Sequence, residues 1–461
     1  MTVYGFPTAN SRVPAPVRSG SMAGPKYVSF ALAATALYGD LLKRVLPGTV
    51  AVALLYAISA VILLAMILTG RRRRTSRTPL ISTLAGMLML TYFLQFCTGF
   101  EVDLLPALMM FIYVCIPLAI IFIIPSAYPE FDIRALAQYT MILIVPIHMI
   151  GIVQHFIDPH FMVSTAYSEM GGVIVRNFLE GTDTFQRLPS LFASADRYAG
   201  VSAMQVFLSF MILSGQKKRQ WRSMLWLAFN LVSAAGGLMI SGARSRILIA
   251  AAALLVAGIA LLFKLVTGQM SNIGKVMLSR AAIVAGLALA GALSFESVRD
   301  HITDMPVVTI LAQTADKGDV QGRFQAAVDI SMVPDGVKFF GEGLGVSGSG
   351  RPGEFGVRAM WIEGGFFWTV IMLIIHAGIL LAIVRGGIRA TLTGNAMLSM
   401  ALTGGGTFWL FGLLAGLSSA FELSLALLLF PMIATAAVAS NRQRAAKPRL
   451  GAGDYLGWGL R

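Results

Sequence analysis

Long apolar runs alternate with short polar connections along most of the chain. A helix rises about 1.5 Å per residue, so about 20 apolar residues cross roughly 30 Å of hydrocarbon. The runs predict about twelve transmembrane helices, at residues 27–43, 48–69, 79–98, 105–124, 138–157, 200–214, 223–241, 247–267, 278–296, 359–384, 395–418 and 421–439. We therefore expect an all-α, polytopic integral membrane protein with a single membrane domain over residues 1–461, whose bundle covers residues 27–439.

Two connections are much longer than the others, at about residues 158–200 and 297–358. Loops longer than about 15 residues are usually functional or disordered. These two mix aromatic residues with glycine and charge, which favours partly ordered loops with short helices against the membrane surface. Residues 321–333 carry apolar side chains at helical spacing and predict one such helix.

Composition agrees with this picture. Hydrophobic residues make up 56% of the chain and charged residues only 13%, about half the charged fraction of a soluble domain (roughly 25%). The net charge of +14 would suggest a nucleic-acid partner in a soluble protein. In a membrane protein, the positive charge can instead show which connections between helices lie in the cytoplasm.

Half of the 36 basic residues fall on alternating connections between the predicted helices. They are Arg71 to Arg74, Arg77, Lys217 to Arg219, Arg222, Lys264, Lys275, Arg280, Arg385, Arg389, Arg442, Arg444, Lys447 and Arg449. The positive-inside rule makes their side the cytoplasm. We therefore expect both termini in the cytoplasm, both long loops on the other side, whose size suits a periplasm, and no nucleic-acid partner. The first 26 residues lack the apolar core of a signal peptide and predict a cytosolic tail.

Few ionisable or polar side chains occur inside the predicted spans. His148, beside Pro146, and Gln95 are the clearest, and an interhelical hydrogen bond is the favoured interpretation of His148. A proton-driven transporter is disfavoured because such carriers use rows of buried charges. Glycines at 404–406 predict close helix packing. Cys97 and Cys115 lie in apolar runs, with neither a disulfide framework nor metal-site spacing.

Two arginines lie in a connection too short to leave the bilayer region. Arg244 and Arg246 follow the seventh predicted helix, and a charge at a helix centre costs about 2.5–3.5 kcal/mol. The planar guanidinium fork suits pyrophosphate. Snorkelling to the interface, or an ion pair with a loop carboxylate, stays open as the alternative.

A second group of candidate residues lies in and after the longer loop. They are Arg323, Gly341-Glu342-Gly343-Leu344-Gly345, Glu354, Arg358 and Glu363-Gly364-Gly365. The glycine spacing does not indicate a dinucleotide site, since no buried strand precedes it and no crossover helix follows. A turn that brings backbone amides to an anion is plausible. Glu363 is expected to begin the tenth helix, where the helix dipole stabilises a carboxylate by about 0.3–1 kcal/mol.

Three blocks of sequence together resemble the O-antigen polymerase and O-antigen ligase family of bacterial surface-polysaccharide enzymes. The first is Arg187-Leu-Pro-Ser-Leu-Phe192 and its continuation to residue 200. The second is Ser-Gly-Ala-Arg244-Ser-Arg246. The third joins Arg323, the glycine turn and Glu363-Gly364-Gly365. The likeness covers roughly residues 187–383.

The resemblance implies a GT-C-like glycosyltransferase without a metal or cofactor. Its substrate would be an oligosaccharide linked to undecaprenyl pyrophosphate, and its partners would be membrane lipids and a chain-length regulator. Arg246 or Arg244, together with Arg323, would match the family arginines that hold pyrophosphate. Arg187 and Arg358 are the remaining outward arginines that topology does not explain, and we expect them to bind substrate.

The sequence departs from the ligases at one place. Those enzymes carry a His shortly before the Glu-x-Gly-like helix start, where this chain has Glu354, and no His lies between His301 and His376. The departure favours a polymerase with Glu354 as general base, with Glu363 or Glu342 as the alternative. A ligase that transfers glycan to lipid A core, a lipid-linked glycan transporter and a purely structural membrane subunit stay open.

Overall fold

The structure of the protein is a computed structural model in which most of the predicted helical regions are described. The described residues are 23–46, 48–70, 80–98, 104–128, 131–158, 161–162, 188–192, 194–215, 221–241, 251, 255, 259, 339–344, 357–393, 395–414 and 423–446.

All regular secondary structure in these ranges is helical. The helices are α1 (Ala23–Val45), α2 (Gly48–Thr69), α3 (Leu80–Thr98), α4 (Leu104–Ala127), α5 (Ile133–Leu143), α6 (Val145–Phe156), α7 (Ala195–Gly215), α8 (Trp221–Ser241), α14 (Val357–Leu392), α15 (Ala396–Leu414) and α16 (Leu423–Ala446). The all-α prediction is confirmed for this part of the chain. The helices predicted at 247–267, apart from isolated positions, 278–296 and 321–333 lie outside the described residues.

Four helical stretches are long and apolar enough to cross a membrane by length and composition. They are Leu80–Thr98, Met110–Ala127, Ile133–Phe156 and Met360–Leu392. Shorter apolar stretches occur at Ala53–Thr69, Leu225–Ser241 and Leu423–Ala439. Large apolar side chains such as Leu68, Val232 and Ile374 are exposed on the outside of the bundle, as expected where the surroundings are lipid. The protein is therefore an all-helical membrane protein over the ranges described.

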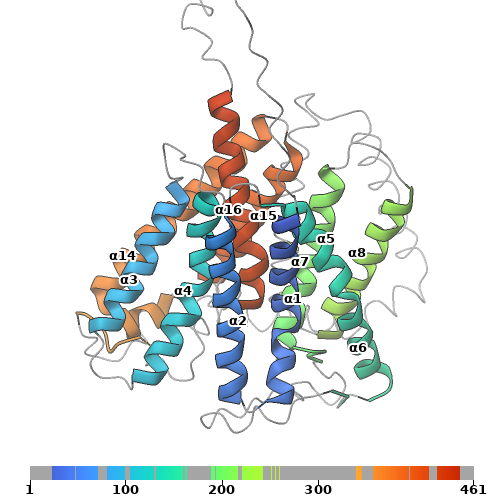
Figure 1. Ribbon diagram of the computed structural model, residues 1–461, viewed down its shortest axis with the longest axis horizontal. Coiled ribbons are helices and arrows are strands. Elements are labelled where there is room, and N and C mark those ends of the chain that lie inside the picture. The colour runs from blue at the N-terminus through green and yellow to red at the C-terminus, as the bar shows by residue number, and fades with distance from the viewer. Residues whose placement is uncertain are drawn as a thin grey trace, which may run out of the picture.

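The helix α16 forms the centre of the bundle (Figure 1). Every residue from 423 to 438 is buried, as expected for a helix that is apolar on all sides. It packs against α1, α4, α7, α14 and α15. In Figure 1, α1 begins and α16 ends at the upper end of the bundle, and the connection from α1 to α2 lies at the lower end.

Two predicted helix boundaries are wrong for local reasons. The span predicted at 138–157 is two helices that meet at Ile144, because Pro146 has no N–H and cannot continue the hydrogen-bond ladder. The first of them, α5, begins earlier than expected because the Asp132 carboxylate accepts a hydrogen bond from the N–H of Ala135 at 3.0 Å.

The glycines at 404–406 lie where α15 packs most closely on three neighbours. A Cβ at Gly404 would overlap the ring of Phe207 on α7, and one at Gly405 would lie 2.6 Å from Cγ1 of Ile433 on α16. At Gly406 the neighbour is Ile383 on α14, with Cγ2 at 2.9 Å. The predicted close packing of this stretch is confirmed.

Replacing Gly404 with alanine should destabilise the bundle. We expect Gly404→Ala to lower the free energy of unfolding by about 1–3 kcal/mol, because the added methyl group overpacks the contact with Phe207. The measurement is thermal or denaturant unfolding of the purified protein in detergent. Gly236→Ala on α8 is the matched control, since a Cβ there meets nothing within 4 Å. Equal effects of the two variants would contradict the packing argument.

Candidate functional site

The helix α14 is broken inside its length at Gly365. This residue has φ 62° and ψ −166°, a backbone conformation that is essentially confined to glycine. The break divides α14 into a short segment that ends at Gly364 and a long apolar segment that begins at Phe366. Glu363 was expected to begin a helix, and this prediction is wrong. Glu363 lies near the end of the short segment, because α14 already starts at Val357 and breaks at Gly365.

A turn formed by residues 339–344 caps both sides of this break. The N–H groups of Glu342 and Gly343 donate to the carbonyls of Ile362 and Glu363, each at 3.0 Å. On the other side, the N–H of Phe367 donates to the carbonyl of residue 339 at 3.1 Å. The turn therefore pairs main-chain groups that a broken helix would otherwise leave unsatisfied.

Gly341 is the residue that lets the turn approach so closely. Its φ is +74°, and a Cβ would overlap the Glu363 carbonyl oxygen and the Gly365 nitrogen. Only glycine fits both demands. The amides of Glu342 and Gly343 are already occupied by α14 carbonyls. The interpretation of these two amides as an anion-binding turn is therefore wrong.

Buried polar side chains gather where the break in α14 packs against α3. Glu363 is only 4% exposed, and its charge interacts electrostatically with Tyr92 of α3. Gln95, one turn further along α3, is 1% exposed, and its Nε2 lies 3.3 Å from where a Cβ of Gly364 would be. Trp368 is a second neighbour of Gly364, with its Cβ 2.8 Å from the same position. We call Tyr92, Gln95, Glu363 and Trp368 the α3–α14 polar cluster.

The opposite surface of the break is aromatic and exposed. The rings of Phe339, Phe340 and Phe367 pack against one another with centroids 4.9–5.7 Å apart. Phe366 joins them and also contacts Trp361. Aromatic side chains favour the boundary between hydrocarbon and headgroups. The break thus has a polar, buried side and an aromatic, exposed side.

The remaining candidate residues from the sequence are mostly not placed. Arg187, Arg244, Arg246, Arg323 and Glu354 lie outside the described residues. Arg358 lies in the first turn of α14, on the same short segment as Glu363. Two parts of the third sequence block, the glycine turn and Glu363-Gly364-Gly365, are brought together.

His148 takes part in a chain of hydrogen bonds that joins α6, α7 and α8. Tyr198 donates to Nδ1 of His148 at 2.9 Å, and Nε2–H of His148 donates to Oε1 of Gln205 at 2.6 Å. Gln205 Nε2 then donates to Oδ1 of Asn230 at 2.8 Å, and Asn230 donates to the carbonyl of Trp226 at 2.9 Å. The requirement that every group be paired assigns the proton of neutral His148 to Nε2. The predicted interhelical hydrogen bond is confirmed.

The start of the first sequence block is fixed to α6 by a single glutamine. Gln154 accepts from the N–H of Ser190 at 2.8 Å, and its amide donates to the carbonyls of Ser190 and Phe161 at 3.0 and 2.8 Å. The hydroxyl of Ser190 donates to the carbonyl of Ile147 at 2.5 Å. The Gln154 side chain thus pairs with both the N–H and the carbonyl of Ser190, and this holds residues 188–192 against α6.

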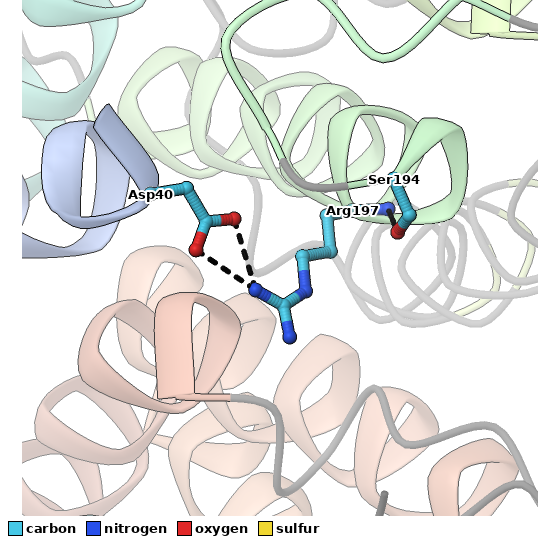
Figure 2. A network of polar contacts seen from close by, with 3 residues as sticks. All are labelled: Asp40, Ser194 and Arg197. Atoms are coloured by element: carbon cyan, nitrogen blue, oxygen red, sulfur yellow. Dashed lines mark hydrogen bonds and ion pairs between the residues drawn. The ribbon is translucent and has the colours of Figure 1, made fainter. Parts of the chain in front are cut away.

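A buried ion pair between α1 and α7 was missed in the sequence (Figure 2). Nη1 of Arg197 lies 2.9 Å from both carboxylate oxygens of Asp40, which is 3% exposed. The hydroxyl of Ser194 accepts from the N–H of Arg197 at 3.3 Å and caps α7. One signal was available, since an acid inside the apolar run at 27–43 demands a partner. The sequence did not identify Arg197 as this partner, because it lies far from Asp40 along the chain.

Metal-ligand geometry is not seen in the part of the chain that the structure describes. No group of three His, Cys, Asp or Glu side chains there is arranged to hold a metal ion. Cys97 and Cys115 are free thiols, the first exposed and the second buried.

Comparison with known proteins leaves the sequence resemblance untested. No protein-family model matches the chain, and no curated protein matches it. Any function assigned to the chain therefore rests on its own residues.

Replacing Gly341 with alanine should detach the turn from α14. The measurement is oxidative cross-linking of a Glu342→Cys/Ile362→Cys pair, whose main chains share a hydrogen bond, in a Cys97→Ser/Cys115→Ala background. We expect efficient cross-linking of the pair and a several-fold lower yield when Gly341→Ala is added, because the new Cβ overlaps the α14 backbone. Gly236→Ala serves as the control. An unchanged yield with Gly341→Ala would show that the turn does not depend on this contact.

Proposed function

We propose that the protein is a polymerase that joins undecaprenyl-pyrophosphate-linked oligosaccharide repeat units into an O-antigen or exopolysaccharide on the periplasmic face of a bacterial inner membrane. One observation carries the proposal. The glycine turn and the Glu363-Gly364-Gly365 segment, two separate parts of the motif that suggests this function, are hydrogen-bonded to each other across the break in α14. If the likeness to the family motif were a coincidence, we would not expect these two segments to be in contact.

The proposed architecture is a GT-C-like bundle of about twelve transmembrane helices with two long periplasmic loops. The apolar helical bundle supports it, as does the position of the start of α1 and the end of α16 at one end of the bundle (Figure 1). In this arrangement both termini are cytoplasmic.

The proposed reaction transfers a glycan from pyrophosphate to a sugar hydroxyl. The bond between the anomeric carbon and the pyrophosphate oxygen breaks, and its electron pair stays with the pyrophosphate. The attacking hydroxyl oxygen forms the new glycosidic bond, and its proton passes to a carboxylate. The transition state resembles the oxocarbenium ion of glycoside hydrolysis. Arg246 or Arg244, with Arg323, would stabilise the charge on the leaving group, and Arg187 and Arg358 would hold the rest of the substrate.

Among the described carboxylates, Glu363 is our candidate for the general base. It is buried beside Tyr92 and Gln95, and its main chain is held by the turn at 339–344. A carboxylate held in a fixed position suits a group that accepts the proton of a bound hydroxyl. Glu342 is half-buried and contributes to the turn through its backbone. Glu354 is the alternative base, on the strength of its place in the loop.

Replacing Glu363 with glutamine should abolish polymer formation. In a strain that lacks the chromosomal gene, a plasmid-borne Glu363→Gln variant should lose about 10²–10⁴-fold in rate, because glutamine cannot accept the hydroxyl proton. The measurement is the chain length of lipid-linked glycans, which should stay at one repeat unit. Glu342→Gln is the matched control and should make long chains. If Glu363→Gln makes long chains and Glu354→Gln does not, the base is Glu354.

The arginines should be needed for the leaving group rather than for folding. We expect Arg246→Ala and Arg323→Ala each to abolish polymer while the amount of protein in the membrane is unchanged, because each removes charge stabilisation from the departing pyrophosphate. Chains of normal length in both variants would exclude this role. In the same extracts, sugar attached to lipid A core instead of lengthened lipid-linked chains would indicate a ligase. Export of unlinked repeat units would indicate a transporter.

A further inference from the structure

Two buried polar atoms beside the break in α14 have no hydrogen-bond partner. They are Oε1 of Gln95 on α3 and Nε1 of Trp368 on α14. The two side chains are 1% and 8% exposed. Buried polar atoms in native proteins are nearly always paired, so each exception needs an explanation. In a membrane protein the imbalance is especially unfavourable, because hydrocarbon offers no substitute for water.

The two other buried glutamines of the described bundle do not share this defect. Gln154 is paired at both ends of its amide, with the loop backbone at residues 161 and 190. Gln205 is likewise paired at both ends, with His148 and Asn230. The fold is therefore able to satisfy a buried amide. The unpaired oxygen of Gln95 is a local feature of the α3–α14 contact.

Both atoms belong to the α3–α14 polar cluster and flank the same glycine. A Cβ at Gly364 would lie 2.8 Å from Cβ of Trp368 and 3.3 Å from Nε2 of Gln95. Glu363, the residue before this glycine, is the proposed base. Gly364 therefore lies in close contact with both residues, and a side chain at this position would collide with them.

The two atoms have complementary chemistry. Oε1 of Gln95 can only accept a hydrogen bond, and Nε1 of Trp368 can only donate one. A hydroxyl group does both, and a sugar ring presents several hydroxyls. We propose that Gln95 and Trp368 form a subsite for hydroxyl groups of the acceptor sugar and hold that sugar next to Glu363. This inference rests on the proposed function, because it assigns the sugar to the polymerase reaction.

Access to this subsite requires α3 and the short segment of α14 to separate. Gly365 is the point at which α14 can bend, since its backbone angles already depart from those of a helix. The turn at 339–344 is hydrogen-bonded to both segments of α14. Binding of the acceptor would therefore be coupled to movement of the turn.

The first test compares two glutamine variants in protein free of sugar. The full chain is purified into phospholipid nanodiscs without glycoside detergents, and the melting temperatures of Gln95→Leu and Gln154→Leu are measured. Gln95→Leu should melt at the wild-type temperature or a few degrees above it, because it removes an unpaired oxygen. Gln154→Leu is the matched control and should melt several degrees lower, because it removes three hydrogen bonds. Equal loss of stability in both variants would overturn the proposal.

The second test measures sugar use. In membranes, Gln95→Leu and Trp368→Phe should each raise the acceptor concentration needed for half-maximal polymerisation by roughly tenfold, as expected for the loss of one hydrogen bond to a bound hydroxyl. Unchanged acceptor dependence in both variants, with wild-type polymer intact, would overturn the subsite and leave the polymerase proposal standing.

A third measurement distinguishes a failure of the proposed subsite from a failure of the proposed polymerase function. If the wild-type chain makes no lipid-linked polymer, the polymerase proposal fails. The subsite is then tested with lipid-free oligosaccharide released by mild acid from the surface polysaccharide of the same cells. A rise in wild-type melting temperature with this probe, absent in Gln95→Leu, would support a hydroxyl subsite. No difference between the two proteins would overturn it.

Discussion

The pairing of main-chain groups around Gly365 is the constraint on which the candidate site depends. Inside a membrane each unpaired N–H or C=O costs several kcal/mol. A break in a helix there persists only when another segment supplies the missing partners. The turn at 339–344 supplies them through its amides and a carbonyl, and the hydroxyl of Thr369 donates to the carbonyl of Met360 at 2.8 Å. The turn and the two segments of α14 are thus one structural unit, and the position of Glu363 follows from it.

Two groups of buried polar side chains in the bundle differ in how they are paired. Those between α6, α7 and α8 are saturated, with each donor matched to an acceptor from Tyr198 to the carbonyl of Trp226. Such a network fixes helix positions and leaves nothing for a ligand to pair with. The α3–α14 polar cluster is different because it combines a buried carboxylate with unmatched donor and acceptor atoms. Structural and proposed functional polarity therefore occupy separate regions of the bundle.

Structural features that depend on the local sequence pattern were predicted, whereas contacts between residues distant in the sequence were missed. The limits of α2 and the end of α8 match the predicted spans because apolar length sets them. The break at Gly365 was missed because two adjacent glycines do not reveal that a turn elsewhere caps them. His148 was expected to have an interhelical partner, but nothing in the local pattern identifies Tyr198 or Gln205.

The ion pair between Asp40 and Arg197 has a consequence for how the chain is assembled. The two residues are 157 positions apart. At about 5–20 residues per second, synthesis of Arg197 follows that of Asp40 by roughly 8–30 s. During this interval the acid of α1 has no Arg197 to neutralise it. The contact that buries Asp40 between α1 and α7 can therefore form only after α7 has been made.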